Sequence, residues 1–282
     1  GTNGSTLSVN PGYILSSNYT VTTTNTALGT INPAQVTLSA VADTKSYDGT
    51  TNSSGKPVYQ VTTFNADLGE TELSANMLYG ADSVTGLSQS FNSPNVVGAT
   101  TVSVNSGYAF SPSGNYTVTT VNTAAGAINP AALTIAANDQ SKTYDGKAFD
   151  FTGTEFTTSG LQNGETIASV TLTTSPDNPA INKGSYAITP SDPVAGAGSN
   201  GTTFLASNYD IAFNTGTLTI NPAALTITAN DQSKTYGDTF TFQGTEFTTA
   251  GLVTGDSVSS ATITSAGAAG TATVVSPGPT YA

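Results

Sequence analysis

Residues 137–144 read ANDQSKTY, and residues 229–236 repeat the same eight residues. The first copy continues with the dipeptide DG and the second with GD. Both dipeptides tolerate the positive φ of a tight reversal, so we expect their exchange to change the turn type rather than the fold. We expect the tyrosine that precedes each dipeptide to pack on the next strand. A repeated stretch of this kind predicts a duplicated structural unit.

The duplication extends along the chain with a period of roughly 95 residues. Asn-Pro pairs end at Pro33, Pro130 and Pro222, which are 97 and then 92 residues apart. The same two spacings separate three tyrosines, Tyr47, Tyr144 and Tyr236. About 95 residues is an ordinary domain size that can bury a core of its own, unlike the 20–50 residues of a solenoid repeat.

This period predicts a tandem array of separate domains. We assign residues 1–33 to the C-terminal part of a preceding repeat. Two full repeats follow at 34–130 and 131–222, and a truncated repeat occupies 223–282. The full repeats contain Tyr-Asp-Gly, whereas the truncated repeat contains Tyr-Gly-Asp.

The composition excludes several classes of function. The net charge is −12, and the six basic residues are all lysine. Binding of nucleic acid or of an anionic membrane surface depends on many Lys and Arg side chains, so we expect neither. The chain has no Cys and no His, which removes disulfides, thiolate chemistry and the commonest general base. No apolar run is long enough to span a membrane, so we expect no membrane insertion.

The apolar residues alternate with a period of two, which is typical of half-buried strands. Leu218 alternates with Ile220 in GTLTINP, and Tyr186 with Ile188 in SYAIT. Thr fills most of the intervening positions, where its branched side chain suits a solvated strand face. We therefore predict an all-β fold of six to eight short strands per repeat, arranged as a β-sandwich of immunoglobulin-like type. A β-grasp-like unit with one short helix is the alternative.

The joints between repeats contain no Gly/Ser linker. Each Asn-Pro pair leads directly into the next strand, AQVTL or AALTI, where the missing N–H of proline is tolerated. Joints of this kind should be stiff. Because a globule of this size is roughly 35 Å across, the array should be an elongated rod of about 100 Å or more.

The two ends of the chain resemble the interior of a repeat. The closing segment GPTYA at 278–282 lines up with GSYAI at 184–188, and the opening STLSVNPGYILSSNYT resembles the tail of a repeat. The chain would then be part of a longer array. As an alternative, the leading strands of one molecule complete the last repeat of the next by strand addition, so that copies assemble into a fibre.

These motifs together resemble a known family. The order of KTYDG, a Gly-Leu pair, GSYAIT, NYDIAF and GTLTINP is similar to that of the YDG and MBG repeat domains of bacterial surface proteins. The Tyr-Gly-Asp copy at 236–238 is like the MBG variant, while the repeat at 34–130 departs most. The resemblance covers nearly the whole chain. It implies a mostly β, extracellular segment of a filamentous-haemagglutinin-like adhesin, and it supplies no catalytic residue.

Carboxylate pairs are the only enzymatic candidates. Glu155 with Glu165, and Glu246 with Asp256, recur at a spacing of ten residues. An acid–base pair requires a cleft and shifted pKa values, and solvated carboxylates beside turns are the simpler interpretation. We therefore predict no enzyme and assign no catalytic, cofactor-binding or metal-binding residue.

A bound calcium ion is the one cofactor we consider. Oxygen ligands suit Ca²⁺, and four aspartates lie near the predicted joints: Asp139, Asp145, Asp231 and Asp238. The acidic residues are scattered, however, and no Asp-x-Asp-x-Asp-Gly loop occurs.

Recurring residues raise the question of two covalent modifications, an isopeptide bond and glycosylation. A Lys–Asn isopeptide bond would need the lysines Lys45, Lys142 and Lys234 and the asparagines Asn18, Asn115 and Asn208. We expect no such bond, because each lysine can lie over a tyrosine or pair with a neighbouring aspartate. Asn18 and Asn115 begin NYT sequons, a pattern that arises by chance in a Thr-rich chain.

Two functions remain after these exclusions. The first is a structural stalk of a surface adhesin or fibre on the bacterial cell, whose partners are the neighbouring repeats of the same polypeptide. The second is a binding module, in which the repeats themselves contact host or surface glycans or proteins. An exposed aromatic patch repeated on one face would favour the second.

Overall fold

The computed structural model describes residues 4–9, 18–21, 25–65 and 70–274. The chain divides into two compact units, which are described separately below: residues 1–131 with 207–210, and residues 132–206 with 211–282. The closing segment at 278–282 lies outside the described residues. Among the described residues, no helix has the length and apolar character needed to cross a membrane.

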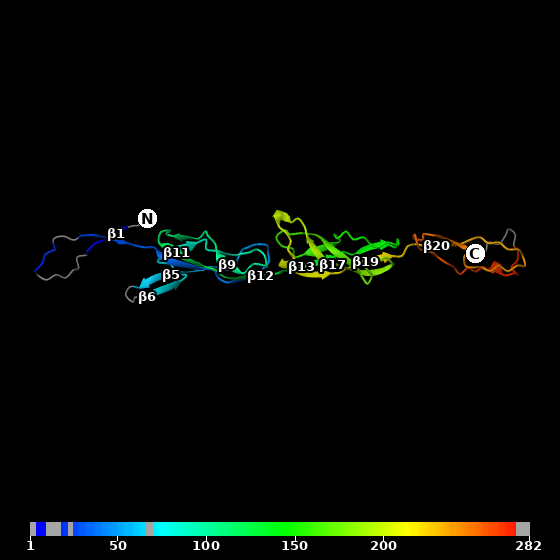
Figure 1. Cartoon of the computed structure of the whole chain (residues 1–282), viewed down its shortest axis with the longest axis horizontal. Coiled ribbons are helices and arrows are strands. Elements are labelled where there is room, and N and C mark those ends of the chain that lie inside the picture. The colour runs from blue at the N-terminus through cyan, green and yellow to red at the C-terminus, as the bar shows by residue number, and fades with distance from the viewer. Residues whose placement is uncertain (1–3, 10–17, 22–24, 66–69, 275–282) are drawn as a thin grey trace. The chain divides into compact units, whose positions relative to one another are not determined.

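The described strands of the first unit form two four-stranded sheets and two short two-stranded ones. Figure 1 draws these strands as arrows. One large sheet has the order β11-β3-β5-β6, with β3 (Ala34–Ser39), β5 (Val58–Asn65), β6 (Glu70–Ala75) and β11 (Tyr116–Asn122). The other has the order β4-β12-β9-β8, with β4 (Asp43–Ser46), β8 (Gln89–Phe91), β9 (Thr101–Val104) and β12 (Ala124–Asn129). The short sheets pair β1 (Gly4–Leu7) with β2 (Ala27–Thr30), and β7 (Ser83–Thr85) with β10 (Ala109–Ser111).

The second unit repeats this plan in a shorter form. A three-stranded sheet has the order β15-β13-β18, with β13 (Ala131–Ala137), β15 (Phe156–Ser159) and β18 (Tyr209–Asn214). A four-stranded sheet has the order β14-β19-β17-β16, with β14 (Gln140–Thr143), β16 (Ile167–Ser175), β17 (Gly184–Ala195) and β19 (Gly216–Asn221). The strands β20 (Thr226–Ala229) and β21 (Phe247–Ala250) form a separate pair.

The all-β prediction is confirmed. Helical residues within the described ranges form only three 3-10 turns: η1 (Ser199–Gly201), η2 (Ala206–Asn208) and η3 (Ala266–Ala268). The short α-helix of the β-grasp alternative is not found in the described residues, and residues 163–164 form a turn instead.

Period-two alternation builds the core of the second unit. Along β19, Leu218 and Ile220 are buried, whereas Thr217 and Thr219, which alternate with them, are exposed. The buried residues of this cluster are Ala137, Ala180, Tyr186, Ile188, Leu218 and Ile220. A buried aliphatic side chain contributes about 1.5–3 kcal/mol to stability, so a few such positions suffice to define the buried face of each strand.

The first unit has an equivalent core. Val36 and Leu38 of β3 are fully shielded from solvent and pack with Val61 and Tyr116. The Tyr116 hydroxyl lies 3.0 Å from a carboxylate oxygen of Asp82 and accepts a hydrogen bond from a backbone N–H. Burial and the Asp82 carboxylate together raise the pKa of Tyr116, burial being the larger cause and the backbone donor acting in the opposite direction.

In the repeats at 34–130 and 131–222, strands near the start of the repeat pair in parallel with strands near its end. The strand β3 pairs in parallel with β11, β4 with β12, and β14 with β19. The N–H of Tyr47 donates to the carbonyl of Asn129, and the N–H of Tyr144 donates to the carbonyl of Asn221, both at 2.8 Å. In these two repeats the tyrosine before the turn and the asparagine before the closing proline are therefore backbone partners.

The turns adopt the conformations that their glycines allow. Gly49 and Gly146 have φ values of 74° and 75°, and Gly237 of the exchanged dipeptide has a φ of 95°. Each repeat therefore places glycine at a left-handed position, whether glycine comes first or second in the pair. The predicted positive φ at these turns is confirmed.

Candidate functional site

A lysine ammonium group organises the Tyr-Asp-Gly turn. Lys142 Nζ lies 2.6 Å from Asp145 Oδ1 and also donates to the carbonyl of Lys147 at 2.9 Å. Lys45 and Asp48 form the same pair at 2.6 Å in the repeat at 34–130. The predicted pairing of these lysines with a neighbouring aspartate is thus confirmed at two turns.

The environment of Asp145 favours its charged form. The ammonium group of Lys142 and then the backbone N–H of Lys147 lower the pKa of the Asp145 carboxyl below its ordinary value. In the third copy, Lys234 Nζ instead donates to the carbonyl of Asp238 at 2.7 Å and to that of Ala269 at 2.8 Å. Exchange of the two turn residues therefore replaces a carboxylate partner with backbone carbonyl groups.

Glu155 closes a second turn through its side chain. One carboxylate oxygen accepts from the N–H and hydroxyl of Thr152, at 3.0 and 2.7 Å. The other accepts from the N–H groups of Gly153 and Thr154, at 3.0 and 3.1 Å. Partial burial raises the pKa of Glu155, but these hydrogen bonds outweigh burial, so that its pKa lies below the ordinary value.

The same arrangement recurs at Glu246. Its carboxylate accepts from the N–H groups of Gln243, Gly244 and Thr245, at distances of 2.8–3.1 Å. These backbone donors, with that of Gln243 foremost, lower the pKa of Glu246. Glu155 and Glu246, considered above as members of acid–base pairs, each serve to hold a turn.

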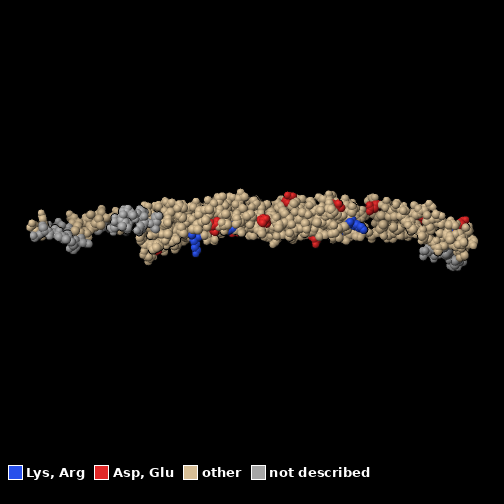
Figure 2. Space-filling model, turned by 90° about the horizontal axis from the view of Figure 1, so that it is seen from below, with Lys and Arg blue, Asp and Glu red and all other residues tan. Residues whose placement is uncertain are grey.

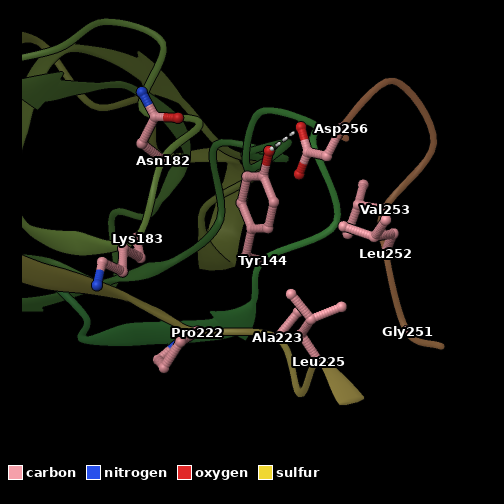
Figure 3. A pocket seen from close by; sticks show the side chains of 10 residues that line it. All are labelled: Tyr144, Asn182, Lys183, Pro222, Ala223, Leu225, Gly251, Leu252, Val253 and Asp256. Carbon is pink, nitrogen blue, oxygen red and sulfur yellow. Dashed lines mark hydrogen bonds between the residues drawn. The ribbon is translucent and has the colours of Figure 1, made fainter. Parts of the chain in front are cut away.

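The other carboxylate of the second pair lies in a groove of the second unit. Asp256 Oδ1 accepts a hydrogen bond of 3.3 Å from the hydroxyl of Tyr144, as the dashed line in Figure 3 shows. This bond and, to a smaller extent, burial raise the pKa of Tyr144. The hydrogen bond joins the turn of the repeat at 131–222 to the repeat at 223–282.

The groove has a volume of about 520 Å³ and combines apolar and polar side chains. Its lining comprises Tyr144, Asn182, Lys183, Pro222, Ala223, Leu225, Gly251, Leu252, Val253 and Asp256. Figure 3 shows the Tyr144 ring beside the aliphatic side chains of the 251–253 segment. Leu225 is 44% exposed and Leu252 is 36% exposed, so the apolar part of the groove is open to solvent.

Most groove residues were missed by the sequence analysis. No motif with a candidate chemical role contains Asn182, Lys183 or Leu225. A signal was nevertheless present in the recurring Gly-Leu pair at 160–161 and 251–252, followed each time by a Gly and a carboxylate. Tyr144 was expected to pack on the next strand, and it does pack partly against the core cluster of its own repeat.

Calcium binding stays a prediction. Of the four aspartates considered, Asp139 accepts from the N–H of Thr217 at 2.7 Å, and Asp145 pairs with Lys142. Within the described part of the chain, no three acidic side chains are grouped so that they could hold a metal ion.

The isopeptide and glycosylation candidates have other interactions. Asn208 is fully buried, where its side chain accepts from the N–H of Val96 at 3.0 Å and donates to Asn95 at 2.9 Å. Asn115 donates to Asp82 at 3.2 Å, and Asn18 is exposed.

Charged side chains lie apart on the visible face of the molecule. Figure 2 shows the Lys and the Asp and Glu side chains as separate spots rather than one patch. With a charged fraction of 9%, most of the surface is formed by uncharged residues. The features that recur along the chain are the lysine-centred turn and the glutamate-centred turn.

The sequence matches one protein-family model. Residues 133–219 and 225–282, together just over half of the chain, match the model of the MBG domain of YGX type. The match covers the Tyr-Asp-Gly copy at 144–146 and the Tyr-Gly-Asp copy at 236–238, and it confirms the resemblance to MBG domains.

The curated proteins contain no match to this chain. Among solved structures, the chain is similar to a cell surface adhesin from Lactobacillus reuteri. The two are 29% identical over 32% of this chain and 95% of the adhesin chain, with a TM-score of 0.21.

Proposed function

The chain belongs to the MBG domain family of YGX type, and from this membership we propose that it is a structural segment of a bacterial surface adhesin or fibre. In this role its repeats are extracellular and hold a binding region away from the cell. The proposal includes no catalytic activity.

The closing bond within each repeat is the observation that carries the structural role. The tyrosine N–H and the asparagine carbonyl meet at 2.8 Å in the repeats at 34–130 and 131–222. Pro130 alone separates β12 from β13, so that one repeat continues into the next without a linker. Self-contained units joined this closely favour a spacer of defined length, since a flexible linker would let the ends approach each other.

Small-angle scattering of the purified chain tests the structural role. An elongated particle with a maximum dimension of about 100 Å or more is expected from domains of this size. A compact globule, or the scattering of a flexible coil, would contradict a spacer. Measurement at several concentrations also shows whether copies assemble, as strand addition requires.

A direct adhesive role is the second candidate, and the groove favours it. An open apolar surface beside a tyrosine ring, with Asn182, Lys183 and Asp256 at its rim, can contact a sugar or a peptide. A screen of immobilised glycans and host proteins with the purified chain would test this role. Binding that is lost in Leu252→Asp and kept in the exposed-site control Thr219→Asp would support it; absence of any binding would leave the spacer role alone.

A further inference from the structure

We propose that the parallel pairing of opening with closing strands in the repeats at 34–130 and 131–222 forms a shear clamp that resists tension along the chain. The clamp consists of β3 and β4 against β11 and β12 in the repeat at 34–130. In the repeat at 131–222 it includes β14 against β19.

The clamp of the repeat at 34–130 extends over both large sheets of the unit. Its parallel register pairs Ala34 with Tyr116 at one end and Ser46 with Asn129 at the other. The N–H of Ala40 donates to the carbonyl of Asn122 at 2.9 Å, between the two parallel pairs. The two terminal strands are therefore held together from the entry of the chain to its exit.

The repeat at 131–222 has the same closure. Its register pairs Gln140 with Leu218 and Thr143 with Asn221. The Tyr144 N–H donates to the Asn221 carbonyl just beyond the last pair, at 2.8 Å. At the other end of this pairing, the N–H of Thr217 donates to the Asp139 carboxylate at 2.7 Å.

Parallel pairing determines how tension acts on these bonds. In a parallel pair, the start of the first strand and the end of the last strand lie at opposite ends. Tension between these points therefore slides the two strands past each other along their axes. The interstrand hydrogen bonds run across that direction, so several must break in one step. In an antiparallel pair, the same points lie at one end and the strands would peel apart bond by bond.

Core packing adds to the resistance. Leu218 and Ile220 of β19 are 0% and 2% exposed, and Val36 and Leu38 of β3 are both 0% exposed. Sliding of either strand withdraws these side chains from their packed positions in the same step that breaks the hydrogen bonds. The clamp strands are thus held by the core as well as by the neighbouring backbone.

The covalent path connects one clamp to the next. Chain tension that leaves β12 at Asn129 passes through Pro130 and enters β13 at Ala131. No slack segment lies between them that could extend first. This inference depends on strand pairing inside each repeat and not on location at the cell surface, so the two proposals can fail separately.

Single-molecule pulling in two directions tests the clamp. Since the chain contains no cysteine, force handles can be attached at introduced cysteines on exposed positions. Ala132→Cys with Thr219→Cys applies tension along the terminal strands of the repeat at 131–222. Ser141→Cys with Ser175→Cys applies it across the β14-β19-β17-β16 sheet, perpendicular to the strands.

The lifetime of the repeat at a given force is expected to be at least about tenfold longer in the first direction, a factor equivalent to about 1.4 kcal/mol of barrier. Thermal melting of both double variants without load verifies that they are equally stable. Where Ser175→Cys lowers the melting temperature, the exposed Asp177, just beyond the end of β16, replaces it as the handle site. Equal lifetimes in the two directions, or a longer one across the sheet, would overturn the proposal.

Discussion

The substitution Glu155→Gln tests how much a carboxylate contributes to the Gly-Thr-Glu turn. Glutamine keeps the size of the side chain but replaces one carboxylate oxygen with an NH₂ group. The N–H groups of Gly153 and Thr154, now 3.0 and 3.1 Å from an acceptor, would then face a donor. Two lost hydrogen bonds, each taken at the low end of the usual range because the group is only partly buried, give a destabilisation of about 1 kcal/mol.

A loss of this size is measurable by calorimetry. For a domain of this length, about 1 kcal/mol corresponds to a decrease of roughly 4–8 °C in melting temperature. The loss should depend on pH in a defined direction. Because folding lowers the pKa of Glu155, its contribution is complete above the unfolded value of about 4.3 and disappears as the pH falls through the folded pKa. The wild type and Glu155→Gln should therefore differ at pH 7 and converge as the pH falls through the folded pKa of Glu155.

The control for this experiment removes the same charge elsewhere. Asp150→Asn changes an exposed carboxylate of the same repeat and should change the free energy of unfolding by less than about 0.5 kcal/mol. Glu246→Gln should destabilise the repeat at 223–282 in the same direction and with the same dependence on pH. Equal melting temperatures at pH 7 would refute the assigned role of Glu155, as would a difference that persists unchanged once Glu155 is protonated.

Three further predictions concern the core, the turn and the groove. Leu218→Ala in the fully buried core should lower the free energy of unfolding, measured with denaturant, by about 2–5 kcal/mol. Thr219→Ala on the exposed face should change it by less than about 0.5 kcal/mol. Similar losses in the two variants would contradict the assigned strand faces. Gly146→Ala, at a φ of 75°, should lower the free energy of unfolding by about 1–2 kcal/mol. Gly114→Ala should lower it less, because a Cβ at Gly114 meets no atom within 4 Å. An unchanged unfolding midpoint for Gly146→Ala would show that the turn adapts and would contradict the prediction. Tyr144→Phe should remove one of the tyrosines that ionise above the ordinary pKa of about 10. The absorbance titration of the variant should then show a smaller tyrosinate signal at high pH than that of the wild type. Identical titrations above that pKa would contradict the hydrogen bond to Asp256.

The strand faces followed from the sequence because burial in a sheet has a period of two. Leu218 and Ile220 were placed on a buried face by alternation alone, and the structure confirms it. The sequence did not predict that the first stretch of the repeat at 34–130 is divided between two sheets. That division occurs near Ala40, between β3 and β4, and it depends on which distant strands, β11 and β12, are available to pair.

The candidate site was predicted less completely than the strands, because several of its hydrogen-bonded residues are far apart in the sequence. The pairing of Lys142 with Asp145 was expected, since three residues separate them. The bond from Tyr144 to Asp256 spans 112 residues and two repeats, and no local pattern indicates it. Glu155 was interpreted as a solvated carboxylate; its three backbone donors are set by the conformation of the turn, including a φ of 82° at Gly153.

The bond between the tyrosine N–H and the asparagine carbonyl has a consequence for how such a gene can change. Donor and acceptor both lie within one period of the sequence, at Tyr47 and Asn129 and again at Tyr144 and Asn221. Unequal recombination between near-identical copies inserts or deletes whole periods, and each such event leaves every donor with its own acceptor. Copy number can therefore vary between descendants of one gene while each copy still folds.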